Sequence, residues 1–202
     1  MSKTALLIVD PQKDFCPGGA LPVASGDAIM EPLNRAIGRA SIIKWPILVS
    51  RDWHPAVTTH FVTHGGPWPV HCVQNTPGAQ FHERLIVDEE SDVIISKAMR
   101  PDEDGYSPLC ANAYVGDGRS AVDYLQDEDI DTLYIGGLAT DYCVKAGVLD
   151  ALKLPFIKKV YLLTDAIGAV DINPGDGQRA IDEMVAAGAV LTTTAEVIGE
   201  EA

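Results

Sequence analysis

The sequence predicts an α/β fold in which a six-stranded parallel sheet carries helices on both of its faces. Two observations lead to this fold class. Short apolar runs recur along the 202-residue chain, and segments with apolar residues at helical spacing lie between them. The first run, residues 4–9, is apolar without alternation, which is typical of a strand buried on both faces. Strands that alternate with helices are joined by right-handed crossovers and therefore form a parallel sheet.

The remaining elements follow from the same patterns. We expect further strands at residues 46–50, 92–96, 132–135, 160–164 and 189–192. Apolar residues recur at intervals of three and four where we expect helices, at residues 27–43, 120–127, 141–152 and 177–187. Residues 55–83 and 99–113 show no sustained period. The first of these stretches is too long for a plain connection, and its aromatic residues favour an ordered, functional loop.

Composition and charge limit the class of protein. A hydrophobic content of 47% is enough for a sizeable core in one domain. The net charge of -14 argues against nucleic acid and anionic membrane surfaces as partners, because a protein needs a basic face to bind either of them. The N-terminus carries no signal-peptide pattern and no apolar run is long enough to span a membrane, so we expect a cytoplasmic protein. In that compartment the four widely spaced cysteines are expected to be free thiols. The sequence leaves open whether the protein forms a homo-oligomer.

Cys143 lies where a strand is expected to pass through a glycine turn into a helix. Gly136 and Gly137 end the apolar run, and the polar pair of Thr140 and Asp141 precedes the helical pattern. At a helix start, free N–H groups and the positive end of the helix dipole lower the pKa of a thiol. The alternative is that Cys143 is a small buried apolar residue, as most free cysteines are. This stretch alone does not decide between the two.

Asp10 and Lys97 are expected at the carboxyl ends of two other strands, where the sites of parallel sheets lie. Together with Cys143 they suit a catalytic triad. A lysine ammonium favours the thiolate, and a carboxylate can accept the thiol proton and pass it to a leaving group. Because the carboxylate charge itself raises the pKa of the thiol, the lysine has to lie close by. The alternative is an ion pair between Asp10 and Lys97 beside a buried cysteine.

A second set of residues suits a metal ion and consists of Asp52, His54, His60 and His71. Asp52 and His54 are two positions apart, so in an extended chain their side chains point to the same side. A ligand set of nitrogen and oxygen suits zinc, iron or manganese, and the spacing does not choose among them. The alternative is a scatter of surface histidines, which would describe His64 and His82. No GxGxxG loop opens a helix after a strand, and the sequence contains no Walker motif or GxSxG elbow.

Four stretches of the sequence are distinctive, and they occur in order along nearly the whole chain. They are residues 8–15 (IVDPQKDF), 51–55 (RDWHP), 65–73 (GGPWPVHCV) and 137–144 (GLATDYCV). Together they resemble the nicotinamidase/pyrazinamidase branch of the isochorismatase-like cysteine hydrolases. The second and third stretches are specific to the metal-containing nicotinamidases. The resemblance implies the Rossmann-like three-layer fold of that superfamily, as one domain over residues 1–202 with a metal-binding loop inserted at about residues 52–83.

The resemblance also implies roles for individual residues. It implies a triad of Asp10, Lys97 and Cys143, and metal ligands at Asp52, His54 and His71. His60 falls where some members place another ligand histidine and others a serine. The resemblance further implies a cis peptide bond between Leu138 and Ala139, and an oxyanion hole formed by the backbone N–H groups of Ala139 and Cys143. Phe15, Trp68 and Tyr106 would line the substrate ring.

The activity that the resemblance implies is metal-dependent hydrolysis of nicotinamide, and also of pyrazinamide, in NAD salvage. The substrate is a small aromatic amide, whose ring nitrogen would bind the metal while Cys143 forms a thioester. We expect one divalent metal ion, with zinc preferred over iron or manganese. One rival is a hydrolase of the same superfamily that acts on a carbamoyl or ureido substrate or on isochorismate. A rival from another class is a non-catalytic metal-binding or thiol redox-sensing protein.

Overall fold

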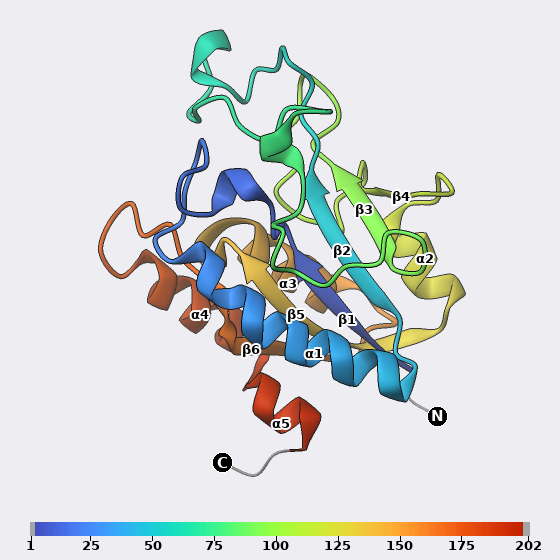
Figure 1. Ribbon diagram of the computed structural model, residues 1–202. Helices are drawn as coiled ribbons and strands as arrows, with labels where there is room; N and C mark the ends of the chain where they lie inside the picture. Colours follow the sequence, from blue (N-terminus) through green and yellow to red (C-terminus); the bar gives the residue numbers. More distant parts are fainter. Residues whose placement is uncertain (1–2, 200–202) are drawn as a thin grey trace.

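The computed structural model describes residues 3–199, which form a mostly parallel seven-stranded sheet (Figure 1). The strands are β1 (Lys3–Val9), β2 (Ile47–Asp52), β3 (Val93–Lys97), β4 (Tyr114–Val115), β5 (Ile130–Leu138), β6 (Lys159–Gly168) and β7 (Val190–Thr192). Their order in the sheet is β4-β3-β2-β1-β5-β6-β7. Only the pairing of β3 with β4 is antiparallel among these strands. The α/β fold class is therefore confirmed.

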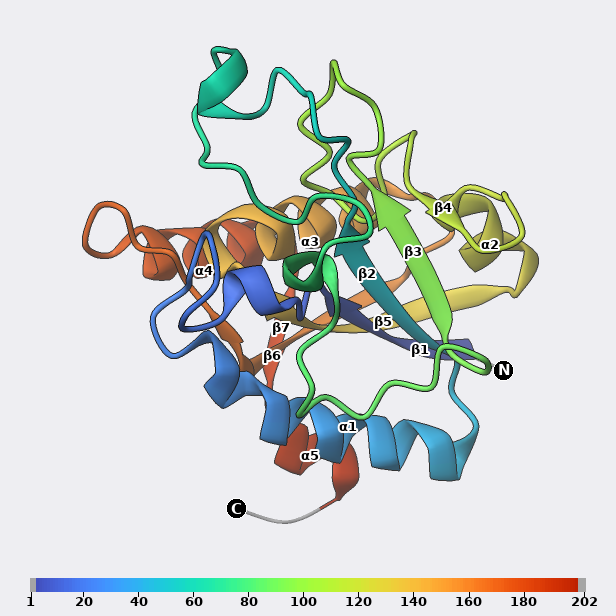
Figure 2. The same ribbon diagram turned by 45° about the horizontal axis from the view of Figure 1, so that its top comes forward.

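Helices cover both faces of the sheet (Figures 1 and 2). One face carries α1 (Met30–Ile43) and α5 (Thr194–Ile198), and the other carries α2 (Ala121–Asp127), α3 (Lys145–Lys153) and α4 (Asp176–Ala187). The two sides of β1 pack into two separate hydrophobic clusters, because alternate side chains of a strand point to opposite faces. Leu6 and Ile8 pack with α1, whereas Leu7 and Val9 pack with the α3 side. The continuous apolar run is thus explained by burial on both faces.

Three details of the predicted elements were wrong. The sheet has seven strands rather than six, because β4 has only two residues and shows no periodicity of its own. Residues 141–152 do not form one regular helix, since Thr140–Val144 form a π-helical turn before α3 begins. The short helix α5 was not predicted. No helix among the described residues is long and apolar enough to cross a bilayer.

The strand order brings the carboxyl ends of four adjacent strands to one edge. Asp52 and Lys97 are the last residues of β2 and β3 and lie opposite each other in the register. Asp10 follows β1 directly, and β5 leads into the turn that carries Cys143. The long connection between β2 and β3, drawn in teal and green in Figure 1, lies across this edge. Side chains from distant parts of the sequence therefore meet there.

Gly137 allows β5 to lie against β1 just before that turn. It has a φ of +127°, and the pairing of β5 with β6 shifts register between Ile135 and Gly137. A Cβ atom at Gly137 would lie 2.1 Å from the carbonyl oxygen of Val9. An L-residue at this position is therefore strained both by its backbone conformation and by the neighbouring strand.

We expect Gly137→Ala to lower the free energy of unfolding by about 3 kcal/mol, the sum of overpacking and backbone strain. Gly116→Ala is the matched control, because nothing lies within 4 Å of a Cβ atom there and its φ is not positive. The control should change stability by less than about 0.5 kcal/mol. Urea unfolding followed by circular dichroism measures both. Equal stabilities of the two variants would contradict this account of the turn.

Candidate active site

Lys97 lies at the centre of the site and is fully buried. Its Nζ atom is 2.8 Å from Asp10 Oδ2 and 3.6 Å from Cys143 Sγ, and it forms a short hydrogen bond to Asp52 Oδ1. Burial opposes the charged form of the ammonium. The two carboxylates outweigh burial and hold the pKa of Lys97 well above its ordinary value. Lys97 is therefore a cation that contacts both carboxylates and the thiol.

Asp10 is the group best suited to accept a proton at this edge. It is fully buried and accepts a hydrogen bond of 2.7 Å from Ser50 Oγ. Burial raises the pKa of Asp10 to about 6, although Lys97 acts in the opposite direction. A carboxyl with this pKa is ionised at neutral pH, yet it is a much stronger base than an exposed aspartate.

The expected lowering of the Cys143 pKa by a helix start was wrong. Burial raises the pKa of the Cys143 thiol well above its ordinary value, and the carboxylates of Asp10 and Asp52 raise it further against the effect of Lys97. One ligand atom from each of Asp10, Asp52 and Cys143 lies within 4.8 Å of the others. The thiol is therefore protonated in the resting protein, and a base has to remove its proton before it can attack.

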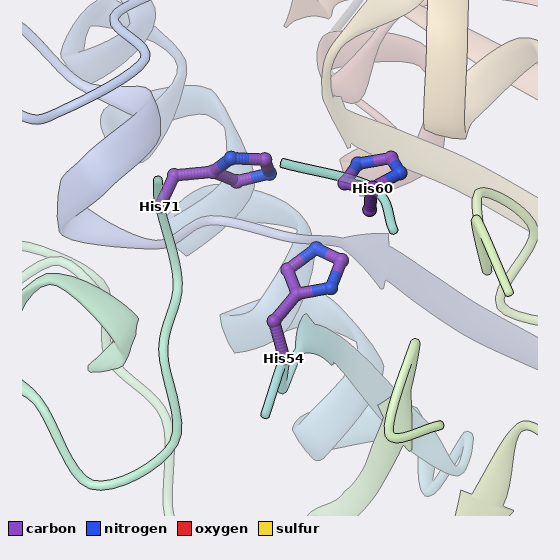
Figure 3. Close-up of side chains that lie close together, drawn as sticks. All are labelled: His54, His60 and His71. Atoms are coloured by element: carbon purple, nitrogen blue, oxygen red, sulfur yellow. The ribbon is translucent and has the colours of Figure 1, made fainter. Parts of the chain in front are cut away.

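Three histidines from the predicted metal set form a second cluster beside the first. His54, His60 and His71 each contribute a ring nitrogen, and these atoms lie within 4.8 Å of one another (Figure 3). Asp52 Oδ2 is 3.7 Å from His54 Nε2 and 3.9 Å from His71 Nε2. Asp52 thus contacts Lys97 through one oxygen and faces two of the histidines with the other. By contrast, His64 is exposed, as the alternative of a surface histidine had suggested.

The chemistry of this cluster fits a divalent cation. His54 is fully buried, and neither of its ring nitrogens has a hydrogen-bond partner, which is costly unless another group binds there. His71 Nδ1 lies 2.7 Å from the Pro69 carbonyl, so it must donate, and Nε2 keeps its lone pair. Burial lowers the pKa of His71 to about 4 and therefore keeps its imidazole neutral. For Asp52, Lys97 and the histidines outweigh burial and hold the pKa below its ordinary value.

Two residues of the stretch 8–15 hold the backbone of the predicted metal-binding loop in place, and sequence reasoning assigned them no role. Gln12 is fully buried, accepts a hydrogen bond of 2.7 Å from the Asp52 N–H and donates one of 2.8 Å to the Asp52 carbonyl. Asp14 accepts a hydrogen bond of 2.7 Å from the N–H of Cys72, the residue after His71. The polar residues of this motif therefore fix the backbone beside two predicted ligands.

Both clusters open into one pocket with an empty volume of about 370 Å³. Its lining includes all three predicted aromatic residues, and Trp68 Nε1 donates a hydrogen bond of 2.8 Å to the Tyr106 hydroxyl. Sequence reasoning missed three other lining residues, namely Leu21, Tyr142 and Val170. Of these, only Tyr142 carried a usable signal, since it directly precedes Cys143. The peptide bond between Leu138 and Ala139 is cis, as the resemblance implied.

Comparison with known proteins identifies the family. A model of the isochorismatase domain matches residues 4–196. This chain belongs to the isochorismatase family. The nicotinamidase of Escherichia coli is 41% identical over 215 residues, which cover 97% of each chain. The chain therefore falls in the nicotinamidase/pyrazinamidase branch and is a hydrolase that acts on an amide, and the non-catalytic rival is set aside.

Two solved structures of this family resemble the chain closely. The pyrazinamidase of Pyrococcus horikoshii in complex with zinc is 43% identical, with a TM-score of 0.84 over 95% of this chain and 99% of the other. A structure from L. infantum in complex with nicotinate is 32% identical, with a TM-score of 0.80 over 96% of this chain and 94% of the other. Zinc and an aromatic acid are thus known ligands of proteins with this fold.

The arrangement of the histidines predicts the effect of removing one of them. We expect His54→Ala to bind much less zinc than the unchanged protein, because the buried ring of His54 packs against both of the other histidine rings. His64→Ala, which removes an exposed histidine of the same loop, should keep its zinc. Elemental analysis after dialysis gives the zinc content per chain. Full zinc content in His54→Ala would show that the ligand set is wrong.

Proposed function

We propose that this protein is a metal-dependent nicotinamidase that converts nicotinamide to nicotinate and ammonia in NAD salvage, and that also accepts pyrazinamide. The observation that carries the proposal is that a buried thiol and a three-histidine cluster share Asp52 and open into one pocket. The names of the similar proteins support the same substrate class. We further propose that residues 1–202 act as a single hydrolase domain.

We propose Asp52, His54, His60 and His71 as ligands of one divalent ion, with zinc preferred over iron or manganese. When bound, the ion would supply a Lewis-acidic positive charge at the part of the pocket that Asp52, His60 and His71 line. The zinc complex of the Pyrococcus horikoshii relative supports this choice of metal. The unpartnered ring of His54 supports the site itself.

The proposed reaction begins with proton transfer from the Cys143 thiol to Asp10. The thiolate attacks the amide carbon, and the N–H groups of Ala139 and Cys143 stabilise the oxyanion that forms. Asp10 then gives its proton to the departing nitrogen, and ammonia leaves a thioester on Cys143. A water molecule deprotonated by Asp10 hydrolyses the thioester to nicotinate. Lys97 keeps Asp10 in place, and its charge favours the thiolate over the thiol.

The aromatic residues would hold the flat substrate ring next to the thiol. Phe15 and Tyr106 line the pocket together with Trp68, and the hydrogen bond between Trp68 and Tyr106 fixes the relative position of two of these side chains. Holding the amide carbon beside Cys143 removes much of the entropic barrier to attack. We therefore assign binding and orientation of the ring to these three residues.

Replacing the nucleophile tests the proposal directly. We expect the protein to release equal amounts of ammonia and nicotinate from nicotinamide, and Cys143→Ala to release neither while it keeps its metal. Cys110→Ala is the matched control, because Cys110 is another free thiol, partly buried, that does not line the pocket. Chromatography of nicotinate and an ammonia assay measure the two products. Hydrolysis by Cys143→Ala would rule out Cys143 as the nucleophile.

The raised pKa of Asp10 predicts the pH dependence of the reaction. Asp10 has to be ionised to accept the thiol proton, so kcat/KM should fall below about pH 6 as Asp10 becomes protonated. The hydrogen bond from Ser50 lowers the pKa of Asp10. Ser50→Ala should therefore move the acidic limb to higher pH. Steady-state rates from pH 4.5 to 8 measure the acidic limb of the unchanged protein and that of Ser50→Ala. A flat profile of the unchanged protein down to pH 4.5 would argue against Asp10 as the base.

A further inference from the structure

Residues 101–106, which follow β3, contact the metal loop through its Thr58–Thr59–His60 stretch and through Trp68. The carbonyl of Pro101 accepts hydrogen bonds from the Thr59 N–H at 2.9 Å and from the hydroxyl groups of Thr58 and Thr59 at 3.1 Å. Tyr106 accepts the hydrogen bond from Trp68 described above. Between these two contacts, Asp104 Oδ1 lies 2.9 Å from His60 Nδ1. A segment remote from the histidine motif in the sequence therefore reaches one of its members.

The contact with Asp104 fixes the proton on the His60 ring. A carboxylate can only accept a hydrogen bond, so Nδ1 of His60 has to carry the hydrogen. The lone pair that remains is on Nε2, and this is the atom that His60 can offer to a cation. His71 has the same arrangement, since its Nδ1 donates to the Pro69 carbonyl. Of these two histidines, His60 is the one whose partner is a side chain and can be replaced.

His60 needs a hydrogen-bond partner to fix the orientation of its ring more than a histidine on a β-strand would. It lies in the irregular connection between β2 and β3, where regular secondary structure does not restrict its backbone. Its ring stacks on that of His54, with centroids 4.7 Å apart, but both orientations of the ring that differ by a flip about the Cβ–Cγ bond can stack in this way. A hydrogen bond to Nδ1 selects one of these orientations. Carboxylates that accept a hydrogen bond from a ligand histidine also increase its basicity as a ligand.

Asp104 itself is held in position by the backbone around it. Gly105 has a φ of +64°, and a Cβ atom there would lie 2.6 Å from backbone atoms of Ala98, which follows Lys97. The segment is thus pressed against the end of β3. The side chain of Asp104 is 63% exposed, so its removal opens no cavity in the core. Its contact with His60 is therefore a directional contact rather than a packing contact.

We propose that Asp104 is a positioning residue of the metal site, which orients His60 so that Nε2 binds the ion directly. This inference rests on the metal site of the proposed function, and it adds a residue outside the histidine motif. Asp104 would act only through His60, and its contribution would appear as metal affinity. Partner residues of this kind typically contribute 10- to 100-fold to metal affinity or activity.

Zinc affinity of the metal-free proteins tests the proposal, measured by competition with a chelating dye. We expect Asp104→Ala to bind zinc at least 10-fold more weakly than the unchanged protein. Asp102→Ala is the matched control, because Asp102 is an exposed carboxylate two residues away that pairs with Arg100. The control should bind zinc within twofold of the unchanged protein. Equal affinities of Asp104→Ala and Asp102→Ala would overturn the proposal.

Two further variants separate positioning from a general structural role. Asp104→Asn keeps an oxygen that can accept from Nδ1, so it should recover most of the affinity lost in Asp104→Ala. In a His60→Ala background, Asp104→Ala should cause no further loss of zinc affinity. An additional loss in that background, or a lower melting temperature of metal-free Asp104→Ala with unchanged affinity, would contradict action through His60.

These experiments distinguish failure of the proposed role of Asp104 from failure of the proposed function. If the unchanged protein binds zinc but releases no ammonia from nicotinamide, the proposed function fails while the comparison of zinc affinities still stands. If the unchanged protein is active and Asp104→Ala binds zinc as tightly as Asp102→Ala does, only the role of Asp104 fails. If the unchanged protein binds no zinc, both fail.

Discussion

The buried ammonium of Lys97, shared between Asp10 and Asp52, is the interaction on which the rest of the site depends. A charge without water is tolerated only when it is paired, and removing one partner of a buried pair typically costs about 3–5 kcal/mol. The pairing therefore holds three adjacent strand ends together. It also links the side of the site that carries Cys143 to the side that carries the histidines, because Asp52 faces both Lys97 and the histidines.

The charges of this cluster account for its protonation states. One ammonium faces two carboxylates, and burial lowers the pKa of His71 and so keeps its ring neutral. Burial is the main reason that proton uptake is favourable at Asp10 and proton loss unfavourable at Cys143, and the carboxylate of Asp52, the negative charge in excess of the ammonium, acts in the same direction at both groups. A divalent cation beside Asp52 would offset that excess. The same electrostatic balance thus explains why the thiol needs Asp10 as a base and why the histidine cluster suits a metal.

The sequence predicted those parts of the site that follow from strand ends and local motifs. Asp10, Asp52 and Lys97 could be placed together because the carboxyl ends of neighbouring parallel strands share an edge. The contacts of Asp104 and Val170 could not be predicted, because they arise from loops whose paths depend on tertiary packing. The two-residue strand β4 was invisible to periodicity. The pKa of Cys143 was predicted in the wrong direction, since the helix-dipole argument neglects the burial of the thiol.

The central claim is that the thiol and the metal cluster act as one active site. The most direct test measures ammonia release from nicotinamide on a single preparation from which the metal has been removed and to which zinc is returned in steps. This account predicts that the rate is lost on removal, rises with the zinc bound and levels off at about one ion per chain, as a single metal site requires. Full activity in the metal-free protein, or no activity at any zinc content, would contradict it.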